Sequence, residues 1–224
     1  MRGLAPAPLT AGELEAASAE EVLAHMLERH HPRVALACSF QKEDAVLIDM
    51  LMRLDPTARV FTIDTGVLFP ETYAAWRELE RRYGVRVEIF DAAREGGWSG
   101  EDCCSAAKVA ALERALAELD GWITGVRRDQ APTRAGAPKL GWDAEHELWK
   151  ANPLADWDDA RCLAYIAERD LPVNPLHARG YASIGCTHCT SPGVGREGRW
   201  AGLDKTECGL HVEGDREAAV EVAR

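Results

Sequence analysis

Seven cysteines are the residues of this 224-residue chain best suited to chemistry, and five of them form a pattern. Cys186 and Cys189 are separated by two residues, a spacing that lets both sulfurs reach one metal ion or one edge of a cluster. Cys103 and Cys104 form a second pair far upstream, and Cys208 stands apart from both pairs. The pattern predicts four metal-binding thiolates and one additional thiol.

The kind of metal stays open from spacing alone. Adjacent cysteines point in divergent directions, which suits the separate iron corners of a [4Fe-4S] cube, whereas a four-cysteine zinc site is the simpler structural alternative. A redox disulfide is a weaker third interpretation. The two remaining cysteines, Cys38 after an apolar run and Cys162 on a helical pattern, are expected to be small buried hydrophobes.

Cys208 has the features of a nucleophile. It lies between charged residues and glycine, with Lys205 on one side and His211 on the other. A cysteine attacks as the thiolate, and a neighbouring basic group favours that form. Its position near the end of the chain suits a group that is delivered to a bound substrate, and the alternative is an incidental exposed cysteine.

Composition limits the classes of function. The chain has 26 Lys and Arg against 37 Asp and Glu, a formal charge of -11, which argues against sequence-independent binding to nucleic acid. No apolar run is long enough to cross a bilayer, and the first eight residues lack a signal-peptide core. We therefore expect a cytoplasmic protein without membrane contact, and a homo-oligomer is compatible with the sequence.

Strand and helix patterns alternate along the chain. Apolar strands are expected at 33–38, 59–63, 85–90 and 122–125, and helices at 11–30, 43–54, 71–83, 104–119 and 156–169. This alternation predicts an α/β fold with a parallel twisted sheet and helices on both faces. Residues 129–147 are expected to form a long loop, and residues after Leu171 an irregular cysteine-bearing segment. We expect residues 1–180 to be a nucleotide-binding unit, and 181–224 to be a cluster-ligand segment and mobile catalytic tail of the same domain.

Parallel sheets bind ligands at the carboxyl ends of their strands. Three loops should meet there: 39–44, 64–66 and 125–134. The first opens a helix and can offer backbone N–H groups to a nucleotide, although it lacks the glycines of a Walker or dinucleotide fingerprint. A basic set flanks the same edge and comprises Lys108, Arg127, Arg128, Arg134, Arg196 and Arg199. Such a cluster in an acidic chain favours a bound phosphate or sulfate.

Taken together, these motifs resemble the assimilatory adenylyl-sulfate and phosphoadenylyl-sulfate reductases, from about Arg33 to His211. The segments that carry the resemblance are Ser39–Leu47, Asp64–Gly66, Phe69–Thr72, Cys103–Cys104, Trp122–Gly125, Arg127–Arg128, Gly180–Thr190 and Lys205–His211. The resemblance implies an adenine-nucleotide alpha-hydrolase-like (Rossmann-like) fold, related to ATP pyrophosphatases, with the nucleotide at the strand ends.

The resemblance also implies a reaction. The Cys208 thiolate would attack the sulfur of adenylyl sulfate (APS), expel AMP and form an S-sulfocysteine, from which thioredoxin or a similar dithiol would release sulfite. Lys108, Arg196 and Arg199 would neutralise the phosphosulfate. The residues implied to hold the nucleotide are Ser39, Gln41, Asp44, Ile63, Gly125, Arg128 and Arg134.

The same resemblance implies a [4Fe-4S] cluster on Cys103, Cys104, Cys186 and Cys189. Family members that act only on the 3′-phosphorylated substrate (PAPS) lack these cysteines, so their presence favours APS; PAPS reduction or dual use is the alternative. Two remoter interpretations are an ATP-pyrophosphatase-like enzyme and a zinc-binding interaction module. The first requires a Ser-Gly-Gly-x-Asp-Ser loop that 39–44 does not supply, and the second leaves the basic residues and Cys208 without a role.

Overall fold

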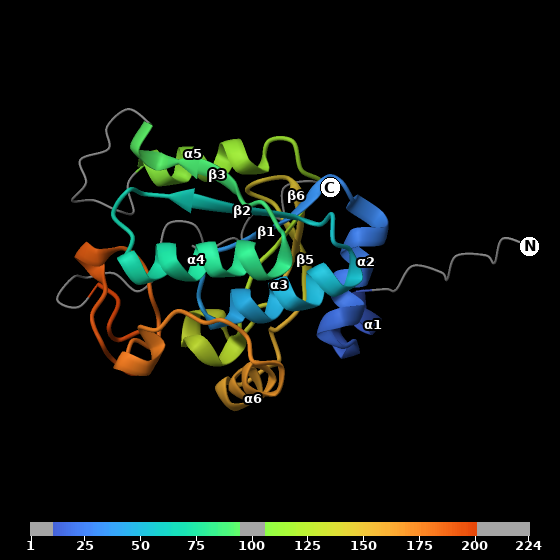
Figure 1. Ribbon diagram of the computed structural model, residues 1–224. Coiled ribbons are helices and arrows are strands. Elements are labelled where there is room, and N and C mark those ends of the chain that lie inside the picture. Colours follow the sequence, from blue (N-terminus) through green and yellow to red (C-terminus); the bar gives the residue numbers. More distant parts are fainter. Residues whose placement is uncertain (1–10, 95–105, 201–224) are drawn as a thin grey trace, which may run out of the picture.

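The computed structural model describes residues 11–94 and 106–200 (Figure 1). Cys103, Cys104 and Cys208 therefore lie outside the described residues, as does the expected start of the helix at 104. No helix in the described ranges is both long enough and apolar enough to span a membrane.

Six strands form one sheet in the order β3-β2-β1-β4-β6-β5. Their bounds are β1 Val34–Ala37, β2 Arg59–Asp64, β3 Glu88–Asp91, β4 Gly121–Ile123, β5 Leu140–Asp143 and β6 Leu148–Ala151. All neighbouring strands pair in parallel except β5, which runs antiparallel to β6 at the edge of the sheet. The predicted α/β fold is confirmed, with one antiparallel edge strand added to the parallel sheet.

The prediction of a long loop over 129–147 is wrong in its second half. β5 lies inside this range, and β6 begins directly after it. Each of the two strands is four residues long, and Gly141, Asp143 and Lys150 interrupt the apolar pattern. Backbone hydrogen bonds between the two strands therefore define this hairpin, which the pattern of side chains does not reveal. The first half consists of two short turns, η2 Arg128–Gln130 and η3 Pro132–Arg134.

The expected helix at 11–30 is divided into α1 (Ala11–Ala16) and α2 (Ala19–His30). Ser18 starts the second helix with a reciprocal cap. Its hydroxyl accepts the Glu21 N–H at 3.2 Å, while the Glu21 carboxylate accepts the Ser18 N–H at 2.7 Å. A strong helix start inside a continuous Ala- and Glu-rich stretch explains why periodicity alone joined the two helices.

Helices cover both faces of the sheet (Figure 1). Their bounds are α3 Lys42–Leu54, α4 Pro70–Tyr83, α5 Ala106–Leu116 and α6 Asp159–Arg169. One apolar core joins α2, α3, α4 and α6 to the sheet, and a second core packs α5 against the other face. Cys38 and Cys162 are buried in the first core, as the sequence predicted.

The segment after Leu171 has irregular backbone as far as Trp200, as expected. It contains two short turns, η4 His177–Arg179 and η5 Thr187–Cys189. A bridge between Leu68 and Cys186 and a hydrogen bond from the Thr187 N–H to the Val67 carbonyl attach it to the chain that follows β2. The segment therefore lies beside the carboxyl ends of the strands.

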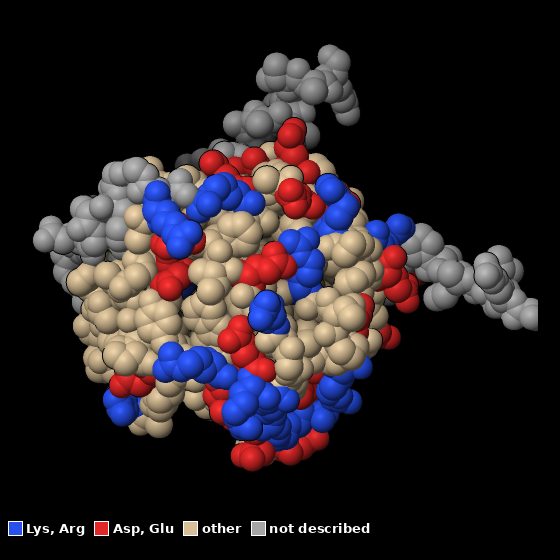
Figure 2. Space-filling view, turned by 45° about the horizontal axis from the view of Figure 1, so that its top comes forward, with Lys and Arg blue, Asp and Glu red and all other residues tan. Residues whose placement is uncertain are grey.

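The surface carries both signs of charge. On the face seen in Figure 2, Lys and Arg side chains are interspersed with Asp and Glu side chains. Among the described residues, several ion pairs join groups that are at least partly exposed, such as Arg81 with Glu78 and Arg179 with Glu71. Pairs of this kind contribute little to stability, about 0–1 kcal/mol each. The buried charged residues are therefore the stronger candidates for a functional role.

Candidate active site at the carboxyl ends of the strands

A cavity of about 870 Å³ opens at the carboxyl ends of β1, β2 and β4. This volume falls in the range of pockets that hold small molecules and cofactors, and is adequate for a nucleotide. Ten of the predicted site residues line it: Ser39, Gln41, Asp44, Ile63, Lys108, Gly125, Arg134, Cys186, Arg196 and Arg199. The structure thus brings together residues that are far apart in the sequence.

The loop between β1 and α3 is wrapped around the carboxylate of Asp44. One oxygen of Asp44 accepts the Ser39 N–H at 2.8 Å, the Ser39 hydroxyl at 2.9 Å and the Gln41 N–H at 3.2 Å. Phe40 adopts a left-handed conformation (φ 60°) and stacks on Trp76 with 5.0 Å between ring centroids. Aromatic packing and the hydrogen bonds to Asp44 hold a backbone conformation that a non-glycine residue rarely adopts.

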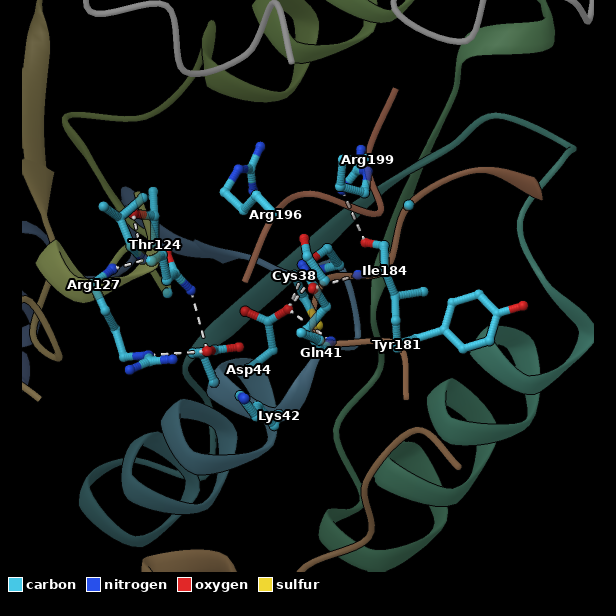
Figure 3. A pocket seen from close by; sticks show the side chains of 18 of the residues that line it. Cys38, Gln41, Lys42, Asp44, Thr124, Arg127, Tyr181, Ile184, Arg196 and Arg199 are labelled. Atoms are coloured by element: carbon cyan, nitrogen blue, oxygen red, sulfur yellow. Dashed lines mark hydrogen bonds and ion pairs between the residues drawn. The ribbon is translucent and has the colours of Figure 1, made fainter. Parts of the chain in front are cut away.

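Asp44 is buried, and burial raises its pKa to about 6 even though three donors favour the ionised form. Its neighbour Gln41 reaches the opposite wall of the cavity, where its side-chain oxygen accepts the Ile184 N–H at 2.8 Å. Figure 3 shows this link between the start of α3 and the irregular segment. The loop therefore ties the two walls of the cavity together.

Gly125, two residues after the end of β4, lets the sheet approach α3 closely. A Cβ at this position would lie 2.9 Å from the Cβ of Glu43 and 3.1 Å from Oδ1 of Asp44. Contacts of that length require the backbone to shift, so any side chain here would separate β4 from the start of α3. A glycine is needed for the shape of the cavity floor.

His177 supports the same helix start. Its Nε2 accepts the Lys42 N–H at 3.2 Å, and its Nδ1–H donates to the Tyr181 carbonyl at 2.8 Å. These two bonds require the neutral ring, and burial lowers the pKa of His177 accordingly. The imidazole satisfies an N–H group at the first turn of α3 that has no partner within the helix.

Arg127 occupies the centre of a buried ionic network. Its side chain is 4% exposed and reaches three carboxylates, those of Glu43, Asp129 and Asp159. The Asp159 carboxylate also pairs with Lys42. Lys42, Glu43 and Asp159 are site residues that sequence reasoning missed. A signal was present, because the charged run at 42–44 opens a helix whose other residues are almost all apolar.

Arg128, which the resemblance placed among the nucleotide contacts, does not line the cavity. Its Nε donates to the Ala137 carbonyl at 2.8 Å, and its guanidinium also pairs with Glu15 of α1. The side chain holds the outside of the 128–139 turn to the N-terminal helix. Arg134 does line the cavity and is held by a 2.6 Å bond to the Gln130 side chain.

Cys186 and Cys189 lie together on the η5 turn and are 2% and 8% exposed. The Thr65 hydroxyl lies 3.2 Å from the Cys186 sulfur, and the Trp200 N–H donates to the Cys189 carbonyl at 2.9 Å. His188, between the two cysteines, is exposed. The turn therefore offers only sulfur to an interior metal, which fits a thiolate-bound cluster or zinc.

Across residues 11–94 and 106–200, no group of three His, Cys, Asp or Glu side chains is placed to hold a metal ion. Two of the four predicted ligands, Cys103 and Cys104, belong to the segment outside these ranges. The described pair thus fits the predicted donor set, and the complete set stays a prediction.

Two arginines, Arg196 and Arg199, line the same cavity as Cys186 and are labelled in Figure 3. The Arg199 guanidinium lies 4.5 Å from the Trp200 ring centroid and donates to the Ile184 carbonyl at 3.3 Å. The Arg196 guanidinium lies 5.3 Å from the same centroid. Gly185 permits this packing, because a Cβ there would collide with the Arg199 guanidinium. Lys108 of α5 lines the cavity as well.

The fold and the strand-end cavity define a class, the α/β proteins with an adenine-nucleotide alpha-hydrolase-like fold. Residues 33–192 match the family described as "Phosphoadenosine phosphosulfate reductase domain", and the chain belongs to this family. The resemblance inferred from the sequence motifs is confirmed.

Curated relatives match along most of the chain. An adenosine 5′-phosphosulfate reductase of Mycolicibacterium smegmatis is 42% identical, covering 90% of this chain and 92% of the relative. A phosphoadenosine 5′-phosphosulfate reductase of Gloeobacter violaceus is 40% identical, covering 86% and 88%. Among solved structures, a phosphoadenylyl-sulfate reductase from Candida auris in complex with phosphate superposes with a TM-score of 0.68 at 28% identity, covering 82% of this chain and 98% of that chain.

Proposed function

We propose that this chain reduces APS to sulfite and AMP in sulfate assimilation, with thioredoxin or a similar dithiol as electron donor. One observation carries the proposal: a single nucleotide-sized cavity joins the 39–44 loop to Arg196, Arg199 and the Cys186 turn. The names of several relatives, adenosine 5′-phosphosulfate reductase, support the choice of substrate.

The first step joins two anions, a thiolate and a sulfate ester, so cations at the sulfate must lower the barrier. Lys108, Arg196 and Arg199 line the same cavity as Cys186. The Trp200 ring and the Ile184 carbonyl hold the Arg199 guanidinium in place. Little reorganisation is therefore needed when charge develops on the leaving phosphate.

The bond changes follow from this arrangement. The Cys208 thiolate attacks the sulfur of APS, the bond between sulfur and the bridging oxygen breaks, and AMP leaves with that electron pair. The product is an S-sulfocysteine on Cys208. One thiolate of the dithiol then attacks the Cys208 sulfur, sulfite leaves with the S–S bonding pair, and the second thiol releases Cys208 by forming a disulfide. The dithiol supplies both electrons.

Cys186 and Cys189 would hold a [4Fe-4S] cluster together with Cys103 and Cys104. When bound, the cluster would supply positive charge beside the substrate rather than carry electrons. The buried, sulfur-only turn supports this assignment. The Thr65 hydroxyl would hydrogen-bond the Cys186 thiolate.

The decisive experiment compares wild type with Cys208→Ser after anaerobic purification, using APS and reduced thioredoxin. We expect sulfite from the wild type only. Without thioredoxin, the wild type should accumulate protein heavier by one SO₃ group, seen by mass spectrometry. Full activity of the serine variant would refute the nucleophile assignment.

The metal is tested separately with Cys186→Ala. The wild type should be brown, with visible absorbance from sulfur-to-iron charge transfer, and the variant should be colourless. A colourless wild type containing zinc would contradict the cluster and leave the four-cysteine zinc site as the explanation.

A further inference from the structure

The two ends of the cavity carry opposite balances of charge. Arg196 and Arg199 lie at one end (Figure 3), and Lys108 and Cys186 also line the cavity. At the other end, three carboxylates from different elements converge on Arg127: Glu43 of α3, Asp129 of η2 and Asp159 of α6. We refer to these three carboxylates as the carboxylate edge.

The cation at the centre of the carboxylate edge is fully engaged. Arg127 donates through Nε to Glu43 at 3.0 Å, through Nη1 to both oxygens of Asp129 at 2.6 and 2.7 Å, and through Nη2 to Asp159 at 2.9 Å. Nη1 also donates to the Trp157 carbonyl at 3.2 Å. A ligand phosphate would have to displace a carboxylate to bind this guanidinium.

Lys42 is engaged in the same way. Its buried ammonium pairs with Asp159, whose side chain is 51% exposed and lines the cavity. Burial would raise the pKa of Asp159, but the hydrogen bond from Lys42 and the charge of Arg127 lower it below its usual value. Asp159 is therefore ionised at neutral pH, and Asp129, 38% exposed, lies beside it.

At this end, carboxylates outnumber cations among the described lining residues. The cations are Lys42, Arg127 and Arg134, and the acids are Glu43, Asp44, Asp129 and Asp159. Figure 3 shows Lys42 and Arg127 across the cavity from Arg196 and Arg199. An additional dianion placed here would meet uncompensated negative charge in a partly enclosed site, where charge repulsion is stronger than in water.

The orientation of the substrate follows from the proposed function, on which this inference rests. With the phosphosulfate at Lys108, Arg196 and Arg199, the nucleoside extends toward the carboxylate edge. A 3′-phosphate is attached to the ribose, on the nucleoside side of the 5′-phosphate. We propose that the carboxylate edge selects a nucleotide with a free 3′-hydroxyl over its 3′-phosphorylated form, and that Asp129 and Asp159 determine this specificity.

The selection works by repulsion. The sulfate end would accept the phosphosulfate of either nucleotide equally, so it cannot discriminate between APS and PAPS. Discrimination then depends on an element that disfavours the wrong substrate. Asp159 contributes twice, because it repels a phosphate directly and also neutralises Lys42, which would otherwise attract one.

The test is the ratio of kcat/KM for APS to kcat/KM for PAPS in wild type, Asp159→Asn and Asp129→Asn. The amide retains the oxygen acceptor and removes the charge. Wild type should prefer APS, and each variant should lower the ratio by about tenfold. Glu168→Gln is the matched control, since it removes a charge from an exposed side chain of the same helix α6 and should leave the ratio unchanged.

Binding of products separates this inference from the proposed function. Calorimetry with AMP and with adenosine 3′,5′-bisphosphate measures binding without turnover. In each variant, the ratio of the Kd for adenosine 3′,5′-bisphosphate to the Kd for AMP should fall by about tenfold, as expected for the kcat/KM ratio. A wild type that reduces neither nucleotide refutes the proposed function, while the two Kd values still decide the inference. The carboxylate edge is refuted as the determinant of specificity if the wild type prefers PAPS. It is also refuted if both variants fold and their ratios of kcat/KM for APS to kcat/KM for PAPS stay within about twofold of the wild-type ratio.

Discussion

Two buried arginines in one cavity have opposite surroundings. Arg127 is 3% exposed and Arg199 is 8% exposed, and both line the space at the strand ends. Three carboxylates surround Arg127. Arg199 faces the Trp200 ring and one carbonyl, and no carboxylate in the described part of the chain pairs with it. Its Nε is also buried without a hydrogen-bond partner among the described residues.

This difference separates a structural cation from one prepared for a ligand. A buried charge is costly unless it is paired and hydrogen-bonded. The protein itself compensates Arg127, so that arginine fastens α3, η2 and α6 together. Arg199 is compensated only in part, and an anionic ligand would complete its environment. Replacing Arg127 should therefore reduce the stability of the fold, whereas replacing Arg199 should reduce activity.

The largest effect is expected from Arg127→Gln. The change removes the partner of Glu43, whose side chain is 6% exposed, and leaves a buried carboxylate uncompensated. We expect the free energy of unfolding to fall by about 3–5 kcal/mol, measured by chemical denaturation. Arg128→Gln, the next residue, breaks a partly exposed pair with Glu15 and should cost about 0–1 kcal/mol. Equal losses in the two variants would contradict the structural role of Arg127.

Arg199→Gln should reduce activity and leave stability intact, the opposite of Arg127→Gln. We expect kcat/KM for APS to fall by about 10²- to 10³-fold, as for removal of a positioned donor to developing charge. The free energy of unfolding should be unchanged or slightly higher, since the variant removes a buried and incompletely paired charge. Arg179→Gln is the control, because Arg179 pairs with Glu71 at the surface and does not line the cavity. A folded Arg199→Gln variant with wild-type kinetics would contradict the assignment.

The sequence could not distinguish these two arginines. Alternating strands and helices predicted the parallel sheet, and strand ends predicted where the loops would meet, because those inferences depend on local pattern and on general topology. The pairing of Arg127 depends on carboxylates from three separate elements, at positions 43, 129 and 159. The side chains of the adjacent residues Arg127 and Arg128 also point to opposite sides of the turn. Arg127 lines the cavity, whereas Arg128 lies outside it and pairs with Glu15.

Other differences from the sequence prediction have the same origin. The β5–β6 hairpin is stabilised by backbone pairing across the edge of the sheet, which four-residue strands with interrupted alternation do not reveal. The α1–α2 break depends on a cap at Ser18 within a helical composition. In contrast, the burial of Cys38 and Cys162 was predicted correctly, because apolar patterns in the sequence report burial directly.

The smallest expected effect extends the comparison to two adjacent acids, Glu43 and Asp44. Glu43 is compensated by Arg127, whereas Asp44 accepts only neutral donors from Ser39 and Gln41, with no cation paired to it in the described ranges. Burial raises its pKa from 3.8 to about 6. The folded state therefore retains a proton that the unfolded chain has already released, so stability contributed by protonated Asp44 is lost as pH rises through this window.

Asp44→Asn isolates that contribution, because an amide cannot ionise. The free energy of unfolding of the wild type minus that of the variant should fall by roughly 2 to 2.5 kcal/mol between about pH 4 and about pH 7, measured by denaturation at a series of pH values. Most of the fall should occur below about pH 6, because in that range the folded carboxyl still holds the proton that the unfolded chain has released. A difference that is flat with pH, or that rises, would mean that the hydrogen bonds from Ser39 and Gln41 compensate the carboxylate as completely as Arg127 compensates Glu43.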